Sequence, residues 1–334
     1  MTHWPPRPTL SPSFYKAHGL GNDYLVFEEG DGWIATKKNV ERVCDRFRGI
    51  GSDGIVALLR PAEVGSPAEE VSGYEAEVEL RMFNPDGGEF ERSGNGLRIL
   101  GSYLARRNSS LRSITAHVGG DRVGMKIHGR SGAQHDISVD MGRALIGPAA
   151  VDADGSTFGA TDEDAAWAAG GVVQTASSRP ASQMWMVAGP EGEQLVVVPV
   201  SVGNPHIVVL VDGPDSLSEA RLAEVGPFLT AHPALRFGAN VQLALAGESG
   251  TCQALIWERG VGRTSASGTS SCAVAVATVV SGRMQPGEIQ VEMPGGALSV
   301  VVTDGLDVTL RGPVEEVVDG ALSEALLATF ERAP

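Results

Sequence analysis

Two short segments combine serine, glycine and a polar residue immediately before an apolar stretch. SGNG at residues 93–96 leads into LRILGSYLARR, and SGT at residues 267–269 leads into SSCAVAVATVV. Serine, asparagine and glycine favour helix caps and turns over helix interiors, so each segment predicts a helix N-terminus. The free N–H groups and the positive dipole end of such a terminus can bind a carboxylate.

The simpler interpretation of either segment is a capped core helix that binds nothing, with Ser267, Thr269 and Ser270 as the caps in the second case. The two segments together favour another interpretation. After Cys272 the second stretch is apolar on every side, which predicts a deeply buried helix. Its N-terminal N–H groups then need a partner. We therefore predict that both helix ends bind one ligand carboxylate.

A third candidate follows an apolar strand at WERG, residues 257–260. Arg259 is suited to clamp a second carboxylate and Glu258 to bind an ammonium group; the alternative is a surface ion pair. Two glycine-rich stretches do not indicate nucleotide binding. GLGND (19–23) lacks the strand–glycine–helix unit of a dinucleotide fingerprint, and GVGRTSASG (260–268) lacks the Gly-Lys-Ser/Thr ending of a P-loop.

The elements that must position these residues are mostly strands. Alternating or short apolar runs predict strands at 24–29, 55–59, 74–83, 113–118, 122–129, 135–142, 194–202, 206–211, 240–246 and 251–258. Helical spacing predicts a helix at 39–49 that includes Phe47 on its apolar face, and another at 216–232 that includes Phe228. The composition of residues 155–192 indicates a long surface insertion.

The order of these elements is close to a repeat. A Gly-Asn turn occurs in each half, at 19–23 and at 203–206, and each is followed after several strands by the Ser-Gly segment and its apolar helix. Binding pockets occur preferentially between domains. The repeat therefore predicts two similar halves with a site at their junction.

Composition excludes several classes of function. The 334 residues carry a net charge of −15, which would repel a phosphate backbone, so we expect no nucleic-acid partner. No apolar run is long enough to span a membrane. Three cysteines without close pairing or metal-ligand spacing predict buried thiols in a reducing cytoplasm and no metal site. The proline-rich residues 1–12 indicate a loose leader without the apolar centre of a signal peptide.

In combination, KAHGLGNDYLVF, FNPDGGEFERSGNGLR, GNPHIVVLV, FGANVQ and WERGVGRTSASGTSSCA resemble the diaminopimelate epimerase family. The resemblance implies an α+β fold of two similar pseudo-symmetric domains, each a curled, mostly antiparallel sheet around a central helix, with the active site in the interdomain cleft. It implies a first domain of 13–141 plus 312–330 and a second of 142–311. It also implies a homodimeric cytoplasmic enzyme of lysine biosynthesis that isomerises an amino acid without pyridoxal phosphate or another cofactor.

The family positions can be transferred residue by residue. Ser93 and Ser267 occupy the places of two catalytic cysteines, and His206 matches a histidine beside the reacting centre. Arg263 stands where the family pattern ERGxGET has glutamate. The matched substrate-binding positions are Asn22, Asn84, Gly94, Asn95, Asn204, Asn240, Glu258, Arg259, Gly268 and Thr269.

The two serines change the expected chemistry. A thiol with a pKa near 8.5 can reach the thiolate, whereas a serine hydroxyl needs an adjacent base. Four explanations stay open: engineered Cys→Ser changes in a true epimerase, a natural isomerase that uses Glu258, His206 or a serine-relayed water as base, a dehydratase, or an inactive amino-acid-binding homologue. We favour a natural isomerase acting on an amino acid, with diaminopimelate as substrate.

Overall fold

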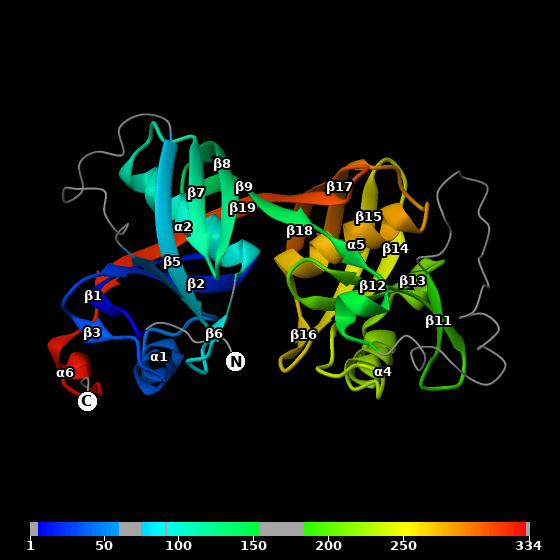
Figure 1. Ribbon diagram of the computed structural model, residues 1–334, viewed down its shortest axis with the longest axis horizontal. Helices are drawn as coiled ribbons and strands as arrows, with labels where there is room; N and C mark the ends of the chain where they lie inside the picture. Colours follow the sequence, from blue (N-terminus) through cyan, green and yellow to red (C-terminus); the bar gives the residue numbers. More distant parts are fainter. Residues whose placement is uncertain (1–5, 60–74, 91, 154–183, 332–334) are drawn as a thin grey trace. The chain divides into compact units, whose positions relative to one another are not determined.

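The computed structural model describes residues 6–59, 75–90, 92–153 and 184–331 (Figure 1). Contacts divide the chain into two compact units. Unit 1 comprises Met1–Asp140 and Gly312–Pro334, and unit 2 comprises Met141–Arg311. The chain passes between them within two strands, β9 (Gln134–Arg143) and β19 (Asp307–Ala321), so β19 contributes to both.

In unit 1 the strands surround one helix. β1 pairs with β2, β2 runs parallel to β4, β4 pairs with β5, β5 runs parallel to β7, and β8 and β9 follow as antiparallel neighbours. β19 pairs with both β9 and β1, which closes the ring of strands. The other elements of unit 1 are β1 (Thr9–Gly19), β2 (Asn22–Glu29), β3 (Trp33–Ile34), α1 (Lys37–Cys44), β4 (Ile55–Leu59), β5 (Glu75–Phe83), β6 (Glu89–Phe90), α2 (Gly94–Arg107), β7 (Ser113–Val118), β8 (Asp121–Ser131) and α6 (Glu324–Leu327).

The enclosed helix is α2, which lies among the strands in Figure 1. Leu97 and Leu100 are fully buried and Leu104 nearly so, as their helical spacing predicts. The polar end of α2 is formed by its N-cap, Ser93. The sheet therefore holds the body of the helix in the core and fixes the place of its N-terminus.

Unit 2 follows the same plan. β12 pairs with β13, β13 runs parallel to β14, β14 pairs with β15, β15 runs parallel to β17, and β18 and β19 complete the sheet. Its elements are β10 (Leu145–Ile146), η1 (Pro148–Val151), β11 (Trp185–Ala188), β12 (Gln194–Ser201), β13 (Pro205–Val211), η2 (Pro214–Ser216), α4 (Glu219–Thr230), β14 (Asn240–Ala246), β15 (Thr251–Glu258), β16 (Gly262–Thr264), α5 (Gly268–Val280), β17 (Gly287–Met293) and β18 (Gly296–Val302).

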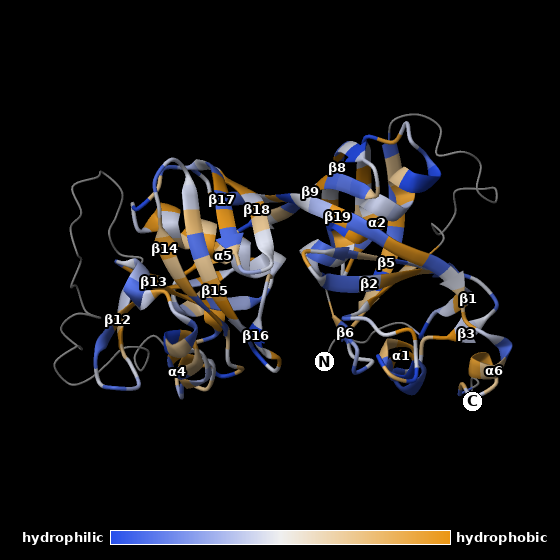
Figure 2. Cartoon of the chain, turned by 180° about the vertical axis from the view of Figure 1, so that it is seen from behind, coloured by the Kyte–Doolittle hydropathy of each residue, from blue (hydrophilic) through white to orange (hydrophobic). Residues whose placement is uncertain are grey.

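The helix at the centre of this second sheet is α5. Every residue from Ser270 to Val279 is buried, and α5 lies among the strands of unit 2 in Figure 1 and in Figure 2. The two parallel pairs of unit 1 (β2 with β4, β5 with β7) recur in unit 2 as β13 with β14 and β15 with β17. The prediction of two similar domains, each a curled sheet around a central helix, is therefore confirmed.

Two predictions in unit 1 were wrong. The stretch 1–12, expected to be a loose leader, includes the start of β1 at Thr9 and the fully buried Leu10; residues 1–5 lie outside the described residues. The helix expected at 39–49 ends at Cys44, because Asp45 caps it in an extended conformation. Phe47 then lies in a turn and is 98% exposed.

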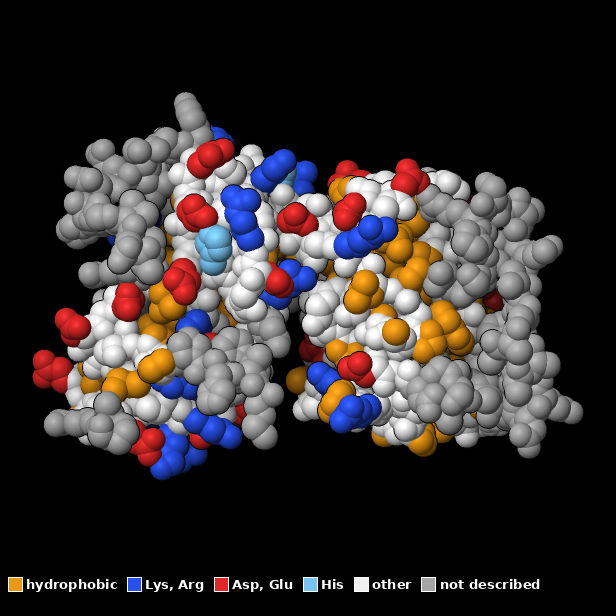
Figure 3. Space-filling model, in the orientation of Figure 1, with side chains coloured by type: hydrophobic (Ala, Val, Ile, Leu, Met, Phe, Trp, Pro, Cys, Tyr) orange, Lys and Arg blue, Asp and Glu red, His pale blue; other side chains and the backbone are white. Residues whose placement is uncertain are grey.

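In unit 2, most of the insertion expected at 155–192 cannot be compared with the structure, because residues 154–183 lie outside the described residues. Its last part was predicted wrongly, since Trp185–Ala188 forms β11 against β12 and Val187 belongs to the core. The three cysteines are all buried and free, as predicted. Basic and acidic side chains are interleaved on the face drawn in Figure 3.

Candidate functional site

The candidate functional residues of unit 1 are built around the N-terminus of α2. The Ser93 hydroxyl accepts a hydrogen bond from the Gly96 N–H at 3.1 Å, and the Ser93 N–H donates to the Met82 sulfur at 3.2 Å. The first N–H groups of a helix have no intrahelical acceptor. Gly94 and Asn95 therefore present backbone donors beside the half-buried serine.

A Gly-Asn turn is fastened to this helix end. The Asn95 side-chain amide donates to the backbone oxygen and to the side-chain oxygen of Asn22, each at 2.7 Å. Arg98, which is 1% exposed, donates to the Asn95 Oδ1 at 3.0 Å. A Cβ on Gly19 would lie 2.1 Å from that oxygen, so only glycine permits this close approach. The turn and the N-terminus of α2 are thus joined by a network of hydrogen bonds.

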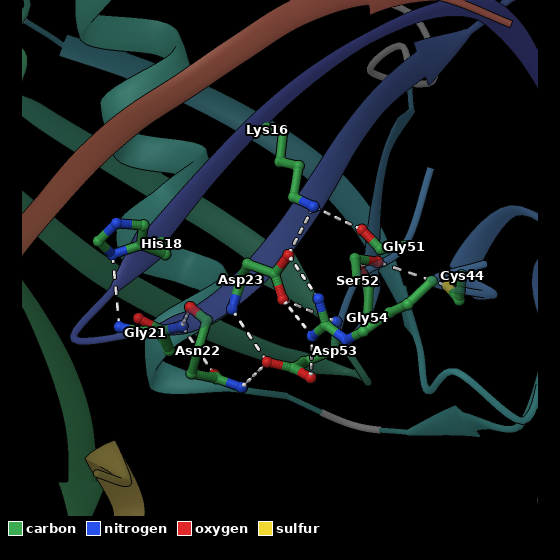
Figure 4. A network of polar contacts seen from close by, with 12 residues as sticks. Lys16, His18, Gly21, Asn22, Asp23, Cys44, Gly51, Ser52, Asp53 and Gly54 are labelled. Carbon is green, nitrogen blue, oxygen red and sulfur yellow. Dashed lines mark hydrogen bonds and ion pairs between the residues drawn. The ribbon is translucent and has the colours of Figure 1, made fainter. Parts of the chain in front are cut away.

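A charged network on the other side holds Asn22 in place (Figure 4). The Asn22 amide donates to Asp53 Oδ2 at 2.9 Å. Arg46 binds both Asp53 and Asp23 at 2.7 Å, and Lys16 lies 2.8 Å from Asp23. Burial opposes ionisation of Asp23, but the bonds from Arg46 and Lys16 outweigh it and lower its pKa. Sequence reasoning missed this network, although Asp53 follows a glycine-rich turn that indicates a constrained loop.

Asn84 lies in the hairpin turn between β5 and β6. Its backbone N–H donates to the Gly88 carbonyl at 2.8 Å, and its carbonyl accepts from the Gly87 N–H at 2.9 Å. The Asn84 residue is exposed. The hairpin therefore fixes the backbone of Asn84 and leaves its side chain open to a ligand.

The candidate functional residues of unit 2 are built around the N-terminus of α5. Ser267 is the N-cap, but its hydroxyl makes no capping hydrogen bond. Its carbonyl accepts from the Ser271 N–H at 3.0 Å and from the Ser271 hydroxyl at 2.7 Å. Gly268 and Thr269 are half-buried beside it. The Ser267 hydroxyl is therefore free of the structural role that Ser93 has.

The Gly-Asn turn of unit 2 repeats the arrangement of unit 1. The Asn204 amide donates to the Thr269 hydroxyl at 3.4 Å. Asn204 stands before β13 as Asn22 stands at the start of β2, and Thr269 is the second residue of α5 as Asn95 is of α2. In each unit, an asparagine of the turn is thus bonded to the second residue of a helix that follows a serine.

His206 has a different place from the one expected of a catalytic base. It is fully buried, with Nε2 2.9 Å from Asn204 Oδ1 and Nδ1 3.1 Å from the Gln242 amide, which also donates to Ser270 at 3.1 Å. Burial lowers its pKa to about 3. Both ring nitrogens are bonded within the protein and the ring is neutral at pH 7, so His206 positions Asn204. Gln242 was not found from the sequence.

Arg259 and Glu258 lie where β15 ends. The Arg259 N–H donates to Asn240 Oδ1 at 2.9 Å, and its Nη1 donates to the carbonyls of Phe237 at 2.7 Å and Gly238 at 3.4 Å. Its Nε and Nη2 make no hydrogen bond to any described residue. This exposed edge of the guanidinium can bind a carboxylate through two parallel hydrogen bonds. Glu258 is half-buried beside it.

Arg263, the departure from the family pattern, turns away to α4. Its Nε donates to Glu219 at 2.6 Å and its Nη2 binds the other oxygen of the same carboxylate. The bond from Arg263 lowers the pKa of Glu219. Since β16 carries Arg263 and pairs with β15, this bidentate ion pair ties the hairpin with Glu258 and Arg259 to α4.

Within the described ranges, no group of three or more His, Cys, Asp or Glu side chains is placed to hold a metal ion. Nor is any described helix long and apolar enough to cross a membrane.

Comparisons with known proteins agree with this geometry. The sequence profile of the family described as diaminopimelate epimerase matches residues 14–146 and 198–316. A diaminopimelate epimerase of Desulforudis audaxviator is 34% identical over 319 residues, covering 92% of this chain and 98% of its own. Among solved structures, a predicted epimerase from Pseudomonas aeruginosa gives a TM-score of 0.61 at 19% identity, over 93% of this chain and 98% of its own. A hydroxyproline epimerase from Agrobacterium vitis gives 0.58 at 15% identity, over 96% and 95%.

Each of the two similar units has a buried helix that follows a serine and is bonded to a Gly-Asn turn. The family match and the curated relatives place the chain among isomerases of the racemase and epimerase class. Within that class, the chain belongs to the diaminopimelate epimerase family.

Proposed function

We propose that this chain is a cofactor-independent isomerase of diaminopimelate, which interconverts the LL and meso forms by removing and returning the proton on one α-carbon. The observation that carries the proposal is the repeated bond between turn and helix end, Asn22 with Asn95 and Asn204 with Thr269. Two equivalent helix ends suit a reaction in which one α-carbon is deprotonated from one side and reprotonated from the other.

The substrate groups are assigned to the residues that suit their charge. The N–H groups of the two helix ends would bind the reacting carboxylate, where they stabilise negative charge as the proton leaves. Arg259 would bind the distal carboxylate through its exposed edge, and Glu258 the ammonium group beside it. The remaining positions that we assign to substrate binding are Asn22, Asn84, Asn204 and Asn240.

The proton acceptor is the step in which this chain departs from a two-thiol mechanism. The hydroxyls of Ser93 and Ser267 are very weak acids, so neither is an effective proton acceptor unless an adjacent base deprotonates it. His206 is enclosed and neutral. Glu258 is then the carboxylate of unit 2 that can accept the proton, through a water held by Ser267, and this role is an alternative to its binding of the ammonium group. We expect slow turnover as a consequence.

A second candidate function is amino-acid binding without turnover. The observation that favours it is the presence of serine at both helix caps, while Arg259 and the asparagines that would bind the ligand are in place. Two other reactions would also demand less of a serine than the removal of an α-proton from diaminopimelate does. One is isomerisation of a substrate with a more acidic proton, and the other is dehydration.

Substitution at the two caps separates these candidates. Ser93→Cys and Ser267→Cys together should raise the rate of α-proton exchange of LL-diaminopimelate at least tenfold, because a thiol ionises near neutral pH and a helix N-terminus lowers its pKa further. Ser109→Cys, at an exposed position of the loop after α2, is the matched control. Binding of diaminopimelate with no exchange by either the wild type or the double variant would refute the isomerase proposal.

A further inference from the structure

The segment Pro6–Pro12, here called the N-terminal strap, precedes the part of the chain that matches the family profile. It is nevertheless built into unit 1. The Ala35 N–H donates to the Pro8 carbonyl at 3.0 Å, the Gly30 N–H to Thr9 at 3.0 Å and the Gly32 N–H to Leu10 at 2.9 Å. With Leu10 fully buried, the strap has a fixed course across the unit.

The strap is fastened to the hairpin that carries Asn84. The Arg7 Nη2 donates to the Gly87 carbonyl, inside the turn, at 3.0 Å, and its Nη1 donates to Ala35 at 3.4 Å. From the hairpin, the Arg81 Nη1 donates to the Pro6 carbonyl at 2.5 Å. The Arg7 guanidinium also lies 5.0 Å from the centre of the Phe83 ring. Contacts in both directions therefore join the two segments.

The hairpin itself is closed by a buried ion pair. Arg81 on β5 binds Glu89 on β6 through two hydrogen bonds of 2.6 Å, and the two side chains are 8% and 2% exposed. This pair fixes the bases of the two strands. The turn beyond them, which includes Asn84 and Gly87, has Arg7 as its side-chain contact from the strap.

Unit 2 holds its corresponding hairpin in a comparable way. β15–β16 carries Arg259 and occupies the same place in the order of elements as β5–β6. There an arginine of the hairpin, Arg263, binds Glu219 on α4. In both units, then, an arginine side chain ties a hairpin with a candidate substrate residue to a neighbouring element. In unit 1 that neighbour is a segment outside the family match.

We propose that the N-terminal strap is a positioning device for Asn84, and that Arg7 is its positioning residue. By gripping the Gly87 carbonyl, Arg7 holds the turn in the conformation in which the Asn84 side chain meets the substrate. The inference rests on the proposed function, since it takes Asn84 as a residue that binds diaminopimelate.

The variant Arg7→Ala removes the grip and leaves the Arg81–Glu89 pair. We expect amide exchange of residues 84–90 with deuterium to speed up at least fivefold, and the Kd for meso-diaminopimelate to rise about 5- to 10-fold, the loss of about one hydrogen bond. Arg7→Lys keeps a donor near Gly87 and should recover part of both. Arg122→Ala, at an exposed position of β8 in the same unit, should change neither.

Exchange measured by mass spectrometry and binding measured by calorimetry give separate answers. A strap with only a structural role would speed exchange throughout unit 1, α2 included, whereas the proposal confines the change to the hairpin. Unchanged exchange in residues 84–90 overturns the grip of Arg7. Faster exchange with an unchanged Kd overturns the positioning of a substrate residue.

A double variant separates this inference from the proposed function. In an Asn84→Ala background, Arg7→Ala should add no further loss of binding, because both changes act through one side chain. Additive losses overturn the proposal. If the wild type itself does not bind diaminopimelate, the proposed function fails, and the exchange result still decides whether the strap holds the turn.

Discussion

The neutral state of His206 is a prediction with a definite size. The ring is fully buried between Asn204 and Gln242, and burial lowers its pKa to about 3. In the unfolded chain the histidine has a pKa of about 6.5, so between about pH 6.5 and pH 3 it is protonated in the unfolded state and neutral in the folded state. The contribution of His206 to the free energy of unfolding is therefore fully present above about pH 6.5 and decreases as the pH falls below that value. The decrease ends near pH 3, where the folded state is protonated as well.

Between about pH 7.5 and about pH 5, His206 alone lowers the free energy of unfolding by about 2 kcal/mol, because only the unfolded chain is protonated at this residue. We therefore expect His206→Gln to remove about 2 kcal/mol from the drop in unfolding free energy over this range, whatever it does to stability at neutral pH. Other buried histidines contribute equally to both proteins and cancel in the comparison.

Urea denaturation followed by circular dichroism, at both pH values, measures this difference. His117→Gln is the matched control, since His117 is exposed and bonded to Glu77 on the surface. An equal drop in the wild type and in His206→Gln would refute the neutral buried ring. His206 would then be available again as a base.

Three further predictions concern the two half-sites. Ser93→Ala should cost about 1 kcal/mol of stability and Ser267→Ala close to none, because only Ser93 caps its helix; thermal melts in the reverse order would contradict this. Gly19→Ala should cost about 1–3 kcal/mol and weaken substrate binding, since its Cβ would meet the Asn95 side chain at 2.1 Å; calorimetry and melts like the wild type's would count against it. Arg259→Ala should weaken diaminopimelate binding about tenfold or more and leave proline binding nearly unchanged, whereas equal losses for both ligands would reject the distal clamp.

The repeat and the helix ends could be predicted because they depend on local signals. Serine, glycine and asparagine before an apolar stretch mark helix N-termini, and α2 and α5 begin at Gly94 and Gly268 as those signals indicate. The second helix is buried on all sides, as its uniform apolar composition predicts.

Contacts between segments far apart in the sequence could not be found in this way. Arg7 and Gly87 meet only through the course of β1, and Arg46 reaches Asp23 and Asp53 from the turn after α1. Neither pairing has a spacing that marks it. Phe47 was placed on a helical face because periodicity alone cannot show where a helix ends, and here Asp45 ends it first.

The most direct test of the central claim is proton NMR of LL-diaminopimelate with the wild-type protein in D₂O, followed by chiral separation of the products. We predict that the α-proton signal disappears as solvent deuterium is incorporated, and that meso-diaminopimelate accumulates. Unchanged α-proton intensity, in the presence of resonances broadened by binding, would contradict the claim. The protein would then be an amino-acid-binding member of its family and not an isomerase of diaminopimelate.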